Sequence, residues 1–128
     1  MTPKTAAFLF AALAMVVAAF QAALALGAPW GRLTWGGKYP GRLPPSMRAA
    51  AVFSMALTLA FALIVAVRAG VLWPGWLGAS QYLVWGVVGY SGLGVVANAI
   101  TPSRWERMLW LPVVAALLAC SLIVATNP

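Results

Sequence analysis

Four long apolar stretches decide what this chain can fold into. They cover about residues 6–26, 48–68, 81–100 and 105–125, and the centre of each stretch is free of charged side chains. At 1.5 Å per residue, a helix of about 20 residues spans the roughly 30 Å hydrocarbon core of a bilayer. Lipid offers no hydrogen bonds to the backbone, so each stretch is predicted to be a transmembrane helix.

Composition agrees with a membrane environment. The 128 residues are 64% hydrophobic and 7% charged, whereas soluble domains average about 45–50% and 25%. The sequence therefore predicts one all-α membrane domain over residues 1–128, a four-transmembrane-helix bundle. The net charge of +7 would suit nucleic acid on a soluble protein, but here the cations flank apolar runs. Anionic lipid headgroups are the expected partners, and nucleic acid is not.

A basic, Gly/Pro-rich segment, residues 27–47, separates the first two stretches. From Gly27 to Arg48 the chain carries four of its eight cations, four of its nine prolines and no acid. Glycine and proline disfavour a continuing helix, and tryptophan and tyrosine suit the headgroup region. We expect a loop that lies along one membrane interface, followed by an N-cap for the second helix at Pro45-Ser46.

The distribution of cations predicts the orientation. With four spans, the first and third connections lie on one side of the membrane, and that side holds six cations against two on the other. The positive-inside rule then places the long loop in the cytoplasm and both termini outside. The six are Arg32, Lys38, Arg42, Arg48, Arg104 and Arg107, and the two are Lys4 and Arg68.

The first stretch allows two interpretations. Lys4, an apolar centre and Ala23-Leu24-Ala25 resemble a cleavable signal peptide, but the apolar run is longer than the usual 7–15 residues, which favours a retained helix. Near its end, Gln21 is expected either to hydrogen-bond another helix or to lie at the interface.

Small residues characterise the third stretch. Gly86, Gly89 and Gly92 recur every three residues, and such spacing permits close helix packing in lipid. The stretch is therefore predicted to be the most enclosed helix; the alternatives are a thin-walled passage or a seam between two copies. Asn98 should have a partner, either Gln21 or the backbone of the loop. On the second stretch, Ser54 and Thr58 are expected to bond back to their own helix.

The fourth stretch begins with a specific capping signal. Ser103-Arg104-Trp105-Glu106 fits the capping box, in which the serine side chain accepts from the N3 amide and the glutamate reaches back. This gives the only acidic residue of the chain a structural role. Further along, Pro112 is expected to kink the helix or to loosen one turn.

The inventory of side chains excludes most catalytic chemistry. The chain has no His and no Asp, one Glu and one Cys, so a catalytic triad, a carboxylate pair and a His-based metal site are all excluded. Cys120 lies in an apolar run and is expected to pack as a small hydrophobe. We expect no enzyme, metal or cofactor; an enzyme acting on lipid would depend on Glu106, helped by Tyr39 or Arg104.

Polar groups nevertheless gather at the cytoplasmic interface. Two helix N-termini, basic side chains and loop amides at one depth are the groups that bind anions. They would either anchor the protein to acidic lipid or form a shaped site for a headgroup or small solute. The candidate ligand-binding residues are Arg32, Trp35, Lys38, Arg42, Arg48, Asn98 and Arg104.

The motifs GAPWG (27–31), WGGKYPGRLPP (35–45) and SRWER (103–107), together with Arg48 and Asn98, resemble those of small four-span bacterial inner-membrane proteins of unknown function. The resemblance implies a four-helix bundle in the bacterial plasma membrane and transfers no activity. We therefore expect a non-enzymatic lipid-binding or accessory protein, acting as a homo-oligomer or in a larger complex. The alternative is an oligomeric transporter or channel for a neutral solute or small anion.

Overall fold

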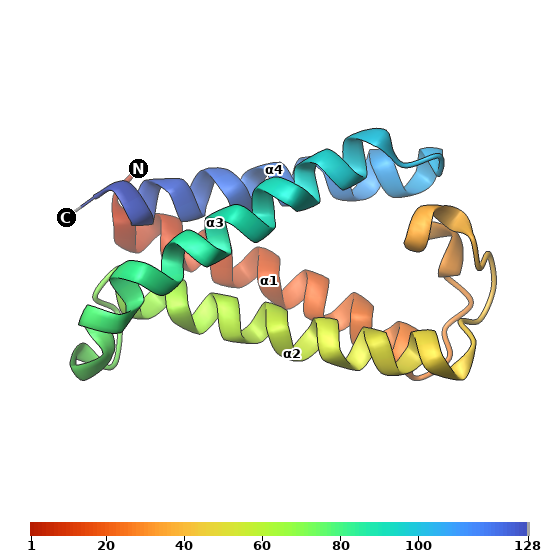
Figure 1. Ribbon diagram of the computed structural model, residues 1–128, viewed down its shortest axis with the longest axis horizontal. Coiled ribbons are helices and arrows are strands. Elements are labelled where there is room, and N and C mark those ends of the chain that lie inside the picture. Colours follow the sequence, from red (N-terminus) through yellow and green to blue (C-terminus); the bar gives the residue numbers. More distant parts are fainter. Residues whose placement is uncertain (128) are drawn as a thin grey trace.

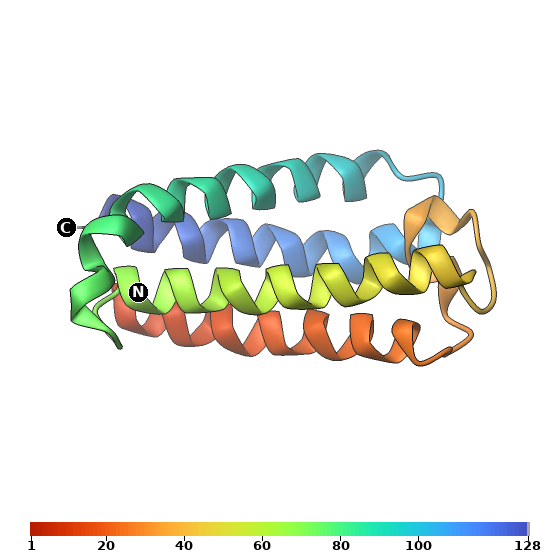
Figure 2. The ribbon, with the colours of Figure 1, turned by 60° about the horizontal axis from the view of Figure 1, so that its bottom comes forward.

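The computed structural model describes residues 1–127, which form a bundle of four long helices (Figures 1 and 2). All four are long and apolar enough to cross a membrane, so the chain is a multi-pass membrane protein with the predicted all-α fold. The helices are α1 (Pro3–Ala25), α2 (Pro45–Arg68), α3 (Leu77–Ile100) and α4 (Arg104–Thr126), and the 3-10 turns are η1 (Gly31–Leu33), η2 (Trp35–Gly37) and η3 (Pro74–Trp76).

Local sequence features determine where the first three helices begin. Thr2 caps α1, because its Oγ1 accepts a hydrogen bond from Thr5 N at 3.1 Å. The predicted cap at Pro45-Ser46 is wrong: Pro44 is the cap residue of α2 and Pro45 already lies in the first turn, where its missing N–H costs nothing. α3 begins at Leu77, earlier than expected, because η3 leads directly into it.

The bundle has two unlike ends. At the terminal end lie both chain termini and the α2–α3 turn; at the loop end lie residues 26–44 and the α3–α4 connection (Figure 1). All four helices pack together toward the terminal end, where the core includes Phe10, Val65, Val84, Val87 and Val124. Toward the loop end α2 and α3 diverge (Figure 1), and a smaller cluster of Leu24, Leu43 and Ala51 joins α1 to α2.

α1 and α4 supply much of the core. Ala6, Phe10 and Ala14 of α1 are buried, so loss of this helix would remove one wall of the bundle. On α4, Cys120 is buried among apolar side chains, and the helix runs through Pro112 without ending.

The prediction that the third helix is the most enclosed is wrong. Its buried face carries Ser80, Val84, Val87 and Ser91, whereas the glycines lie on another side. A Cβ built on Gly86, Gly89 or Gly92 would have no neighbour within 4 Å from elsewhere in the described chain. The spacing of small residues does not specify which face of a helix meets its neighbours, so these glycines face outward.

Candidate functional site

Residues 31–37, here called the docked loop, lie against the start of α4. Three hydrogen bonds hold them: Ser103 Oγ donates to Arg32 O at 2.7 Å, Trp110 Nε1 donates to Leu33 O at 2.9 Å, and Gly36 N donates to Glu106 Oε2 at 3.2 Å. Each bond joins residues about 70 positions apart in the chain. The long loop is therefore fixed to the bundle and does not extend freely from it.

Only half of the predicted capping box forms. Ser103 Oγ accepts from Glu106 N at 3.2 Å, as expected. The Glu106 carboxylate does not return to Ser103, whose amide donates to Thr101 Oγ1 at 3.2 Å instead. Because Thr101 satisfies that amide, the carboxylate is available to bind Gly36.

Two glycines and one strained tryptophan shape the docked loop. A Cβ on Gly31 would lie 1.7 Å from Tyr39 O, so only glycine fits there; its amide donates to Gly41 O at 3.0 Å. Gly36 has a φ of 66°, and Trp35 has a φ of 53°. A bulky residue at positive φ is unfavourable and occurs where the surroundings impose it, often at functional sites.

A cavity of about 640 Å³ lies beneath the docked loop, between the four helices. Pockets for small ligands usually measure about 300–1,000 Å³. On α1 its wall runs from Gln21 to Phe10, about 16 Å along the helix axis at 1.5 Å per residue. The cavity is thus deep enough to reach from the interface past the middle of the span.

The wall of the cavity includes residues of α2 and α3 and several exposed side chains. Phe61 and Tyr90 close the seam between these helices, with ring centroids 5.0 Å apart in an edge-on arrangement. Nearer the loop end, Trp35 and Ile100 line the cavity yet are 51% and 75% exposed. These exposed wall residues leave the cavity partly open at the loop end.

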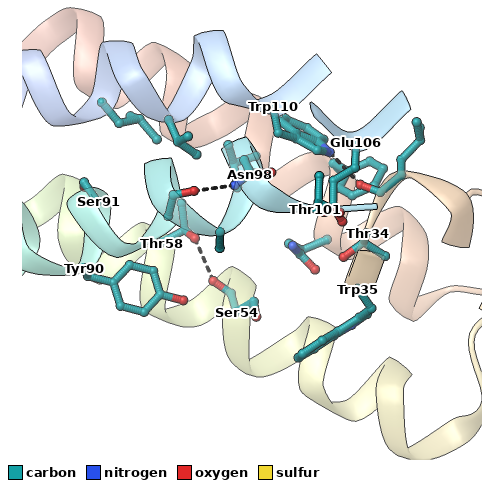
Figure 3. A pocket seen from close by; sticks show the side chains of 18 of the residues that line it. Thr34, Trp35, Ser54, Thr58, Tyr90, Ser91, Asn98, Thr101, Glu106 and Trp110 are labelled. Carbon is teal, nitrogen blue, oxygen red and sulfur yellow. Dashed lines mark hydrogen bonds between the residues drawn. The ribbon is translucent and has the colours of Figure 1, made fainter. Parts of the chain in front are cut away.

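Two polar side chains of the cavity wall bond to the backbone of their own helices (Figure 3). Thr58 Oγ1 donates to Ser54 O at 2.7 Å, as predicted. Asn98 Nδ2 donates to Gly94 O at 2.7 Å, so the expected bond to Gln21 or to the loop is wrong. Its helix supplies the carbonyl that a distant partner would otherwise have to provide.

Glu106 is the charged group of the cavity wall. It is 8% exposed, and within residues 1–127 its side chain has one hydrogen-bond partner, the Gly36 amide. No lysine or arginine of the described chain donates a hydrogen bond to it. The other carboxylate oxygen accepts no hydrogen bond from the described chain, so it can accept one from a ligand in the cavity.

The six loop-end cations divide into two groups. Arg48 Nε donates to Ala25 O and Arg107 Nη1 to Thr101 O, each at 2.9 Å. Both arginines therefore bind carbonyls at or just beyond helix C-termini, where positive charge is favourable. The other four, Arg32, Lys38, Arg42 and Arg104, are exposed.

The predicted site residues meet in several places and do not form one cluster. Trp35 and Asn98 both line the cavity. Arg32 and Arg104 converge on Trp105, with guanidinium carbons 5.6 and 5.8 Å from its ring centroid. Elsewhere, Lys38 lies 5.5 Å from the Tyr39 ring centroid.

Sequence reasoning missed most of the cavity wall. Ser54 and Thr58 were visible as a polar pair on one helix face, but that pattern is the same whether the face meets a cavity or not. Phe61, Tyr90 and Trp110 were indistinguishable from packing residues. The indole N–H of Trp110 was the one available signal, because a buried tryptophan usually finds an acceptor.

Compared with family models, curated proteins and solved structures, the chain matches none of them. The functional argument therefore depends on the cavity, its exposed wall residues and the charges at the loop end.

Proposed function

We propose that this protein is a non-enzymatic membrane component that binds a membrane lipid. One acyl chain enters the cavity between α2 and α3, and the anionic part of the headgroup lies among the exposed cations at the loop end. The observation that carries this proposal is a deep, partly open cavity at the more basic end of the bundle, with the exposed residues Trp35 and Ile100 in its wall.

A lipid suits both parts of this surface. The deep wall is formed by Phe10, Val17 and Leu117, which favour an apolar chain over water. At the loop end, exposed arginines such as Arg32 and Arg104 can bind phosphate oxygens. Trp35 of the cavity wall is an aromatic residue of the kind found at headgroup level.

The same proposal includes the location. Six cations on the loop side favour a cytoplasmic loop and outer termini in a bacterial plasma membrane, so the lipid would come from the cytoplasmic leaflet. Transport of a solute is the weaker alternative, because the four-helix core containing Val65, Val84 and Val124 lies between the cavity and the terminal end. Catalysis is weaker still, because Glu106 is the one carboxylate of the chain.

Native mass spectrometry after mild detergent extraction tests the proposal. The wild-type chain should retain about one phospholipid through exchange into a second detergent. Thr58→Trp places an indole in the cavity and should reduce retention at least about fivefold. Ala56→Trp is the matched control, because Ala56 is exposed on the same helix, two residues before Thr58. This variant should retain lipid like the wild type.

Two outcomes would contradict lipid binding in the cavity. One is a wild-type chain that carries no lipid after mild extraction. The other is equal retention in Thr58→Trp and Ala56→Trp, which would assign any bound lipid to the outer surface of the bundle.

A further inference from the structure

The charged groups at the start of α4 have opposite signs and separate environments. Glu106 is buried in the cavity wall, whereas Arg104 is exposed two residues earlier on the same first turn of α4. Two residues rise about 3 Å along a helix, so these two backbone positions lie at nearly the same depth, on opposite sides of α4. Arg32 joins Arg104 on the ring of Trp105.

A purely anionic headgroup fits only part of this arrangement. Its phosphate would bind the exposed arginines, but the buried carboxylate of Glu106 would gain no partner and would repel the added negative charge. A cationic amphiphile without phosphate would face the opposite difficulty, because the exposed cations would repel it. A headgroup that carries both charges satisfies both groups.

Resting on the lipid-binding function proposed above, we propose that the preferred ligand is an amine-bearing zwitterionic phospholipid. Its ammonium group donates hydrogen bonds to the Glu106 carboxylate at the cavity wall. Its phosphate lies outside the cavity, bound by the long side chains of Arg32 and Arg104, and a short spacer joins it to the ammonium. The carboxylate thereby selects the headgroup, and the cavity holds the acyl chain.

Binding of lipids with identical acyl chains tests this selection. The delipidated chain is titrated in detergent with phosphatidylethanolamine, with its N-acetylated derivative and with phosphatidylglycerol, and bound lipid is counted by native mass spectrometry. The N-acetylated lipid keeps the phosphate and the spacer but loses the ammonium charge. Phosphatidylethanolamine should bind at least about tenfold more tightly than either of the others.

Glu106→Gln removes the charge and keeps a similar shape. It should lower phosphatidylethanolamine affinity to the level of the amine-free lipids, while phosphatidylglycerol binding stays equal or improves. Trp110→Phe is the matched control, because it removes a loop-to-α4 hydrogen bond without changing charge. It should weaken all three lipids alike and preserve the tenfold ratio.

The outcomes separate the two proposals. If the wild type binds all three lipids equally, or if Glu106→Gln keeps the preference, amine selection is overturned while lipid binding stands. If no lipid binds, the proposed function fails as well. Water-soluble glycerophosphoethanolamine should not compete, because it lacks the acyl chain; competition at equal concentration would overturn the membrane source of the ligand. Should Glu106→Gln not fold, the three-lipid comparison on the wild type still decides the matter.

Discussion

The carboxylate of Glu106 and the backbone amide of Gly36 are joined by a 3.2 Å hydrogen bond across 70 residues of sequence. This contact ties the long loop to the start of α4 and places the only acid of the chain in the wall of the cavity. One side chain therefore takes part both in closing the loop end and in the chemistry proposed for the ligand.

Glu106→Ala should release the docked loop. A hydrogen bond to a charged group contributes about 1.5–3 kcal/mol, so hydrogen exchange at residues 31–37 should accelerate roughly tenfold or more. Exchange in the core helices, measured in the same sample by mass spectrometry, should change far less. Unaltered exchange at the Gly36 amide would show that this contact does not hold the loop.

Gly31→Ala should destabilise the protein, because the new Cβ would collide with Tyr39 O. We expect a loss of at least about 2 kcal/mol, seen as a melting temperature in detergent lower by about 5 °C or more. Gly41→Ala is the control from the same loop, because a Cβ there has no neighbour within 4 Å. Equal melting temperatures for the two variants would contradict the loop geometry.

Gly86→Ala and Gly89→Ala should leave the isolated chain as stable as the wild type or slightly more so. Both positions face away from the bundle, and alanine is favoured over glycine inside a helix by about 0.5–1 kcal/mol. Thermal melting and the oligomeric state are measured together. A lower melting temperature accompanied by loss of an oligomer would instead reveal that a second copy packs on this face.

Side-specific labelling tests the orientation. In a Cys120→Ala background, single cysteines replace Lys38 in the loop and Gly75 in η3, both of which are exposed. A membrane-impermeant maleimide added to intact cells should label the Gly75→Cys variant. The Lys38→Cys variant should react only after the membrane is opened, and its labelling on intact cells would reverse the proposed orientation.

Features that depend on hydropathy could be predicted from the sequence. The side of each helix that meets its neighbours could not. Four apolar runs and a Gly/Pro-rich loop are local signals, so the helices and the position of the loop could be predicted. The outward face of Gly86 and Gly89 could not, because glycine spacing does not reveal which side meets a neighbour. The partner of Glu106 could not be predicted either, since the local capping-box pattern competes with an amide 70 residues away.

The cavity was hidden for a related reason. Ser54 and Thr58 give the same sequence pattern on a packed face as on a cavity wall. The docked loop lies at the end of the bundle where α2 and α3 diverge (Figure 1). That arrangement depends on long-range contacts such as Trp110 to Leu33.

A crystal structure of the wild-type chain, grown in a lipid mesophase doped with phosphatidylethanolamine, tests the central claim most directly. The account predicts elongated density between α2 and α3, running from Trp35 toward the Phe61–Tyr90 contact, with the headgroup next to Glu106. A closed seam in which α2 and α3 touch along their whole length, with no space for an acyl chain, would contradict it.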